Sequence, residues 1–225
     1  MMKKLSKDGS KHVTDEFFNT WIMIFGAVLS IIGAAFLIYF SLKEEKLWHL
    51  LAFAIYGGTL VNLFICSALH HGVDGSEKTE HLLRQLDYYA VFILIAGSFT
   101  PFCLIVLRND LGFLILALVW AFAIIGIGLK AFIPKISKWI ILSFYLGMGW
   151  LGVFLASPLY EKLSNGVFLI LLGGIFFTVG AVIYYKEYPN PIPGKFGFHE
   201  IWHLHVLAGT ACHFFVSYLY LLPYP

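Results

Sequence analysis

The sequence predicts an all-α fold, a bundle of seven transmembrane helices, and three observations lead to this prediction. Of the 225 residues, 60% are hydrophobic and only 12% are charged, whereas soluble domains carry roughly a quarter charged residues. The charged residues leave seven uncharged runs, each 19 to 27 residues long. A helix of about 20 apolar residues crosses the hydrocarbon core of a bilayer, and lipid permits little other than helices for such segments.

Each run is expected to form one membrane-spanning helix. In chain order the runs cover residues 17–42, 47–73, 88–107, 111–129, 139–160, 163–185 and 201–225. The first run is too long for the apolar part of a signal peptide, so it is expected to be retained as the first helix. In the third run Pro101 is expected to bend the helix. In the fifth, Gly147, Gly149 and Gly152 are expected to allow close helix packing.

The short connections between runs predict one transmembrane domain, residues 17–225, after an N-terminal segment of residues 1–16. Lysine and arginine residues decide its orientation, because cytoplasmic loops are enriched in them. Eleven lie in the N-terminal segment (Lys3 and Lys4 among them) and in the second, fourth and sixth loops, against four on the other side. The N-terminus is therefore expected in the cytoplasm and the C-terminus outside. The formal net charge of +2 is too small to indicate a nucleic-acid partner.

Polar residues far apart in the sequence are predicted to meet at the cytoplasmic end of this bundle. His199 and His203 begin the last run four residues apart, so on a helix they share a face about 6 Å apart along the axis. Ser67 and His71 have the same spacing at the end of the second run, and Asp87 is expected at the start of the third helix. Ionisable groups that converge at helix ends inside a membrane bundle are functional by default.

Helix geometry excludes other residues near these positions. His70 points about 100° away from the residue that follows it, and His205 lies about 240° around the helix from His199. His213 lies about 21 Å deeper along that helix. His205 and His213 are expected to serve packing or interface roles. Glu200, about 100° off the face of His199, is expected only to cap the helix start.

Three neutral imidazoles from His71, His199 and His203, with a fourth position left for water, describe a catalytic zinc site, because a structural site uses four protein ligands. Asp87 is placed to accept a hydrogen bond from that water and to act as its base. Ser67 is placed to donate a hydrogen bond to the water or to a developing oxyanion.

The motifs Ser67-x3-His71, "LDYYAVFILIAGSFTP" with Asp87, and His199-x3-His203 followed by "HVLAGTACHF" resemble, over nearly the whole chain, haemolysin III and its relatives, the progestin and adiponectin receptors. This family belongs to a superfamily that includes the alkaline ceramidases. The resemblance implies that the three histidines bind zinc and that Asp87 holds the water at the metal, with Ser67 beside them.

A further family motif, E-x2-N-x3-H, appears here as Glu16-x2-Asn19 with Met23 at the histidine position. This departure removes a polar group from the first helix. An adiponectin-receptor role is disfavoured because only 16 residues precede the first run. The same brevity, taken with the resemblance, favours a bacterial cytoplasmic membrane protein.

The leading functional hypothesis is a zinc-dependent hydrolase of a lipid amide bond, as the ceramidase-like relatives suggest, with membrane lipids as partners and an acyl-chain substrate that enters laterally between helices. The alternative is a non-enzymatic sensor or regulator of membrane state, in which zinc holds the second and seventh helices together. A haemolytic pore former is disfavoured, because the sequence has no charged stripe to line a pore.

Overall fold

The structure is a computed structural model that describes residues 6–133 and 135–225. These residues form eight α-helices and two short π-helical turns, with no β-strand among them. In chain order the elements are α1 Glu16–Lys43, α2 Leu47–Gly72, α3 Glu77–Pro101, η1 Phe102–Val106, α4 Asp110–Phe132, α5 Lys138–Trp150, α6 Val153–Leu163, α7 Gly166–Lys186, α8 Phe198–Val216 and η2 Ser217–Leu221.

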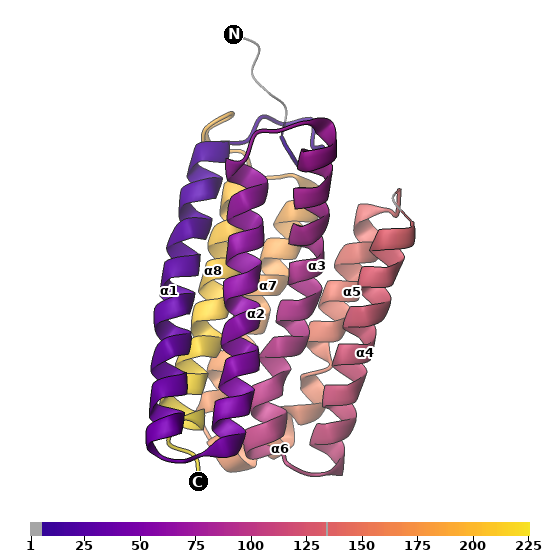
Figure 1. The fold of residues 1–225 in the computed structure, drawn as a ribbon. Coiled ribbons are helices and arrows are strands. Elements are labelled where there is room, and N and C mark those ends of the chain that lie inside the picture. Colours follow the sequence, from indigo (N-terminus) through magenta and orange to yellow (C-terminus); the bar gives the residue numbers. More distant parts are fainter. Residues whose placement is uncertain (1–5, 134) are drawn as a thin grey trace.

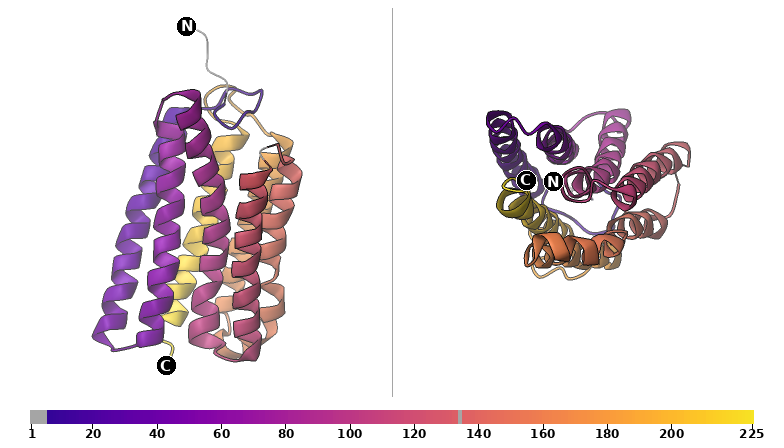
Figure 2. Two further views of the ribbon diagram at one scale, coloured as in Figure 1. Left: turned by 45° about the vertical axis from the view of Figure 1, so that its right-hand side comes forward. Right: turned by 90° about the horizontal axis from the view of Figure 1, so that it is seen from below.

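The prediction of seven membrane spans is confirmed. The structure has seven helical segments long and apolar enough to cross a membrane, with α3 and η1, α5 and α6, and α8 and η2 each counted as one. The segments run along one common direction, and the start of α1 and the end of η2 lie at opposite ends of the bundle (Figure 1). Viewed from below, α4 lies at the edge of the bundle beside α3 and α5 (Figure 2). Of the lysines that favoured a cytoplasmic N-terminus, Lys3 and Lys4 lie outside the described residues.

Helix α3 begins earlier than expected, and this corrects the placement of Asp87. The helix starts at Glu77, where the side chain of Ser76 accepts a hydrogen bond from the backbone N–H of Thr79. The negative charges of Glu77 and Glu80 in its first turn interact favourably with the positive end of the helix dipole. Asp87 therefore lies well inside the helix and not at its start, because the polar stretch before the apolar run is also helical.

The fifth span is broken, and the close packing expected of its glycines is wrong for two of them. Helix α5 ends at Trp150 and α6 begins at Val153. A Cβ atom added to Gly147 or Gly149 would meet no atom within 4 Å, so neither position is in close contact with a neighbouring helix. The break leaves Gly149 and Gly152 on the wall of an internal cavity.

Two clusters of buried apolar side chains hold the bundle together. The larger one includes residues of every helix, and the smaller one joins α1, α2, α3 and α8. Met23, which stands where the family motif has histidine, is 1% exposed in the smaller cluster. Helix α1 therefore places a thioether in the apolar interior at this position.

Pro101 is followed directly by η1, a wide helical turn of the kind found where an α-helix is interrupted.

Candidate metal centre

Three imidazoles converge in the buried interior at the end of the bundle where α2 ends and α8 begins. Nε2 of His71 lies 3.3 Å from Nε2 of His199 and 3.1 Å from Nε2 of His203. All three side chains are buried. His199 and His203 share one face of α8, and the last turn of α2 supplies His71. The structure thus brings together the three histidines that the sequence singles out as ligands.

The donor atoms fit a zinc ion. Two nitrogen ligands of a tetrahedral zinc at 2.0–2.1 Å lie about 3.3 Å apart, and the two measured distances are 3.1 and 3.3 Å. Ligand atoms of the three residues all lie within 4.8 Å of one another. Three neutral Nε2 atoms that present lone pairs to one another repel, so a cation between them is the arrangement that their chemistry favours.

Carboxylates face the outer nitrogens of two of these rings. Oε2 of Glu16 lies 2.6 Å from Nδ1 of His71, and Oδ2 of Asp8 lies 2.6 Å from Nδ1 of His199. The second contact is equally short, although its alignment departs from that of a hydrogen bond. A carboxylate at Nδ1 holds the proton there and leaves Nε2 free as a ligand. Glu16 and Asp8 are thus placed to orient the ligands.

The groups around Asp8 keep its carboxyl ionised. Burial raises the pKa of this carboxyl. The imidazole of His199 and a hydrogen bond with His70 lower the pKa by more than burial raises it, so the net pKa lies well below its usual range. Asp8 is therefore an ionised acceptor that faces both rings.

Glu200 fixes the start of α8, the helix that carries His199 and His203. Its Oε2 accepts a hydrogen bond from the backbone N–H of Gly197 at 2.8 Å, as a helix cap does. Its Oε1 also accepts from the backbone N–H of Asp15 at 2.7 Å and from the amide of Asn19 at 3.2 Å. Glu200 is thus more than the cap that the sequence predicts, because it joins the start of α8 to the start of α1.

Asp87 and Ser67 lie beside the three histidines. Asp87 lines a polar cavity of about 270 Å³ together with His199 and His203. Its carboxylate lies close enough to interact with His70 and His71 and with the hydroxyl of Ser67. Among the described residues, Asp87 is not part of the group of potential metal ligands that the three histidines form. Its place suits a base that acts on a molecule in the cavity.

The remaining histidines lie outside the three-histidine group. Nε2 of His70 lies 3.0 Å from Oδ1 of Asp8, and this ring supports the carboxylate from the side opposite His199. Nδ1 of His205 bonds to the carbonyl of Ile201 within the same helix. His213 lies between the rings of Phe102 and Phe177, deep in the bundle.

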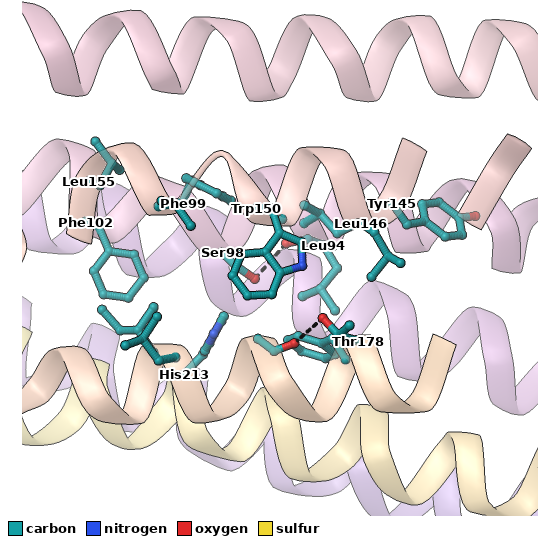
Figure 3. Close-up of a pocket in the computed structure, with 18 of the residues that line it drawn as sticks. Leu94, Ser98, Phe99, Phe102, Tyr145, Leu146, Trp150, Leu155, Thr178 and His213 are labelled. Carbon is teal, nitrogen blue, oxygen red and sulfur yellow. Dashed lines mark hydrogen bonds between the residues drawn. The ribbon is translucent and has the colours of Figure 1, made fainter. Parts of the chain in front are cut away.

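A second, apolar cavity of about 160 Å³ adjoins the polar one. Val91, Tyr145 and Trp202 line both cavities. Figure 3 shows Tyr145 near one end of the apolar cavity and Phe102 and His213 at the other, with Trp150 between Ser98 and Thr178. The arrangement places an apolar cavity next to the polar one that His199 and His203 line.

Sequence reasoning missed Asp8 and the contact that Glu16 makes with His71. Glu16 could have been found from sequence, since it is the first residue of the Glu16-x2-Asn19 motif. In the structure Glu16 contacts His71, and Asn19 donates a hydrogen bond to Glu200. Asp8 could not have been found, because it is a single acid in a lysine-rich segment far from its partners in sequence.

Comparison with known proteins agrees with the resemblance seen in the motifs. The sequence profile described as "Haemolysin-III related" matches residues 11–214. The chain is 37% identical over 217 residues to "Hemolysin-3 homolog" of Bacillus subtilis (strain 168), covering 95% of this chain and 97% of that protein. It is 39% identical to "Hemolysin-3" of Bacillus cereus, covering 95% of each chain. The human "Monocyte to macrophage differentiation factor" is 26% identical, over 92% of this chain and 84% of its own.

Proposed function

This chain belongs to the haemolysin-III related family of multi-pass membrane proteins, and from that membership and its buried histidines we propose that it is a zinc-dependent hydrolase of a lipid amide bond. The proposed ligands are His71, His199 and His203. The proposed base is Asp87, and Ser67 is the proposed partner of the reacting oxygen.

One observation carries the proposal: three histidines converge, and among the described residues no fourth histidine, cysteine or carboxylate completes the group. Structural zinc sites use four protein ligands, whereas catalytic sites use three and keep a position for water or substrate. Zinc held there supplies Lewis acidity, which polarises a carbonyl and makes water a nucleophile at neutral pH.

Asp87 and Ser67 have separate roles in the proposal. Asp87 opens onto the same cavity as His199 and His203, so its carboxylate can take the proton from a water that attacks a carbonyl carbon there. Ser67, buried and in contact with Asp87, either fixes the orientation of that carboxylate or donates to the developing oxyanion. The proton then goes from Asp87 to the amine that leaves.

The two adjoining cavities support a lipid as the substrate. An amide group placed in the polar cavity has an apolar cavity beside it, and Val91, Tyr145 and Trp202 line both. Ligand sites of this kind bury an apolar body and fix its orientation with a few polar groups. An acyl chain in the apolar cavity would therefore position the bond to be broken near His203.

A second function, a non-enzymatic regulator that uses zinc to staple the bundle, is favoured by where the ligands come from. Helix α2 packs mainly on α1 and α3, and α8 packs mainly on α7. A metal shared by His71 and His203 would therefore tie together two helices that have few other contacts, and metal binding would stabilise the closed bundle.

The deciding experiment uses purified protein in nanodiscs, with metal content and lipid hydrolysis measured on the same samples. Wild type is expected to carry about one zinc per chain and to release fatty acid from N-acyl lipids. His203→Ala is expected to lose both, and Asp87→Asn to keep the zinc and lose hydrolysis. The exposed residues His81 and Asp110 provide the matched controls His81→Ala and Asp110→Asn.

The outcomes separate the two functions. If Asp87→Asn hydrolyses lipid as fast as wild type, the proposed mechanism is wrong. If wild type binds zinc and loses thermal stability on chelation but releases no product from any N-acyl lipid, the stapling function replaces the hydrolase.

A further inference from the structure

Residues 6–15, here called the N-terminal strap, lie across the end of the bundle that holds the histidines (Figure 1). Lys7 fastens the strap to the end of α2: its Nζ donates to the carbonyls of His71 at 2.8 Å and Val73 at 2.9 Å. Its side chain is only 8% exposed, and it also lies 3.2 Å from the carboxylate of Asp74. A lysine at the carbonyl end of a helix is stabilised by the helix dipole.

The far end of the strap is fastened as well. The hydroxyl of Ser10 donates to Oε2 of Glu187 at 2.7 Å, and Nζ of Lys138 donates to Oε1 of the same carboxylate at 3.1 Å. The backbone N–H of Asp15 donates to Glu200. The strap therefore contacts the ends of α2, α7 and α8 and is held at several points along its length.

Between these attachments, Asp8 enters the interior. Its side chain is 8% exposed, with Oδ1 at 3.0 Å from Nε2 of His70 and Oδ2 at 2.6 Å from Nδ1 of His199. Each carboxylate oxygen thus faces one ring nitrogen. A carboxylate in this position is desolvated, and the strap contacts that hold it there offset the cost of its burial.

We propose that Asp8 is a positioning residue for the metal centre: it holds His199 with Nε2 directed at the site, so that strap docking and metal binding favour each other. The inference rests on the metal site of the proposed function and does not depend on hydrolysis. His71 likewise has a carboxylate at Nδ1, since Oε2 of Glu16 lies at the same distance, 2.6 Å, from that nitrogen. Two of the three ligands thus have a carboxylate behind them.

Physical chemistry fixes the size and the symmetry of the effect. Carboxylates behind metal-ligating histidines typically contribute 10–100-fold in metal affinity. Because the coupling is a property of the equilibrium, the metal must strengthen strap docking by the same factor by which docking strengthens metal binding. His70 takes part in the same arrangement, since its Nε2 contacts Oδ1 of Asp8 and it lies outside the three-histidine group.

The test compares wild type, Asp8→Asn, Asp8→Glu and the control Asp110→Asn in nanodiscs at one pH. Zinc affinity is measured by competition with a chelator, and the site is also loaded with Co²⁺ for its absorption spectrum. Asp8→Asn is expected to lower zinc affinity about 10–100-fold and to change the Co²⁺ spectrum, with Asp8→Glu recovering part of the loss. If the carboxylate of Asp8 only stabilised the fold, Asp8→Asn would lower the unfolding temperature and leave both the zinc affinity and the Co²⁺ spectrum unchanged.

The reciprocal measurement is hydrogen exchange of the strap. Zinc is expected to slow exchange in residues 6–15 of wild type and to have a smaller effect in Asp8→Asn. If Asp8→Asn does not fold, Ser10→Ala serves instead, because it removes the bond to Glu187 and so loosens the strap without replacing a partner of His71, His199 or His203. It is expected to lower zinc affinity in the same direction, by a smaller factor.

Unchanged zinc affinity in both Asp8→Asn and Ser10→Ala overturns the inference and leaves the proposed function standing. Two ions bound per wild-type chain also overturn it, because Asp8 and His70 would then be ligands of a second metal, for which they lie close enough together. Wild type that binds no metal overturns this inference and the proposed function together.

Discussion

Oε1 of Glu200 accepts a hydrogen bond from the backbone N–H of Asp15 at 2.7 Å, across 185 residues of chain. The contact joins the first residues of α8 to the first residues of α1. It therefore fixes the two helix starts that carry His199 and Glu16, the first in the histidine group and the second in contact with Nδ1 of His71.

Replacing Glu200 should destabilise the bundle strongly. The side chain is 1% exposed and accepts from Gly197, Asp15 and Asn19, so Glu200→Ala leaves two buried donors and one part-buried donor without their acceptor. We expect a loss of about 3 kcal/mol in the free energy of unfolding. Glu200→Gln should lose less, because one acceptor oxygen remains. The exposed Glu161→Ala serves as the control in thermal unfolding, and equal midpoints for Glu200→Ala and this control would contradict the prediction.

The seven spans could be predicted because hydrophobic length is a local property of the sequence. The length and hydrophobicity of each uncharged run predict one membrane span, and the structure has one span for each run. The ends of the spans were less accessible. Polar residues continue α3 outward as far as Glu77, and the turn between Trp150 and Val153 divides the fifth span without any charge to mark it.

The polar contacts of the site divide in the same way. His199 and His203 could be paired from sequence because helix geometry relates residues four apart, and His71 was placed by the depth at which its helix ends. Asp8 could not be found, because its contacts depend on how the strap folds back over the bundle. Nothing in the spacing of residues 6–15 specifies that path.

The contact between α3 and α4 should be sensitive to a single methyl group. A Cβ atom at Gly126 would overlap the ring of Phe92, whereas one at Gly128, two residues later in the same helix, would meet nothing within 4 Å. Gly126→Ala is expected to destabilise the protein by about 1–3 kcal/mol through overpacking. Gly128→Ala is expected to be neutral or to stabilise by up to about 1 kcal/mol. Thermal unfolding of the two variants checks this, and the reverse order of stability would refute it.

Docking of the strap onto Glu187 should weaken in acid. Partial burial raises the pKa of this carboxyl, but hydrogen bonds from Ser10 and Lys138, together with the nearby His12, lower it to a net value below normal. A lowered pKa means that the ionised group stabilises the docked state above the ordinary glutamate pKa, about 4.3, and that this stabilisation is lost as the pH falls through the lowered value.

The measurement is hydrogen exchange of residues 6–15 in wild type and Glu187→Gln at a series of pH values. Wild type should be better protected near pH 7, and the difference between the two proteins should shrink below about pH 4. Because both proteins share every other titrating group, a difference that persists unchanged into acid would assign the protection to something other than the charge of Glu187.

Replacing His213 by leucine should stabilise the protein when its cavity holds no ligand. Both ring nitrogens are buried without an aligned hydrogen-bond partner, although one lies near the backbone of Ile170. A buried polar group in this state costs about 1–3 kcal/mol, and an apolar side chain of similar size removes the cost. His213→Leu should therefore unfold at a higher temperature than wild type in detergent, whereas His205→Leu, which loses the contact with Ile201, should not. If His213→Leu is instead less stable, the ring must be paired in the membrane, and the natural partner is a polar group on a chain that occupies the apolar cavity.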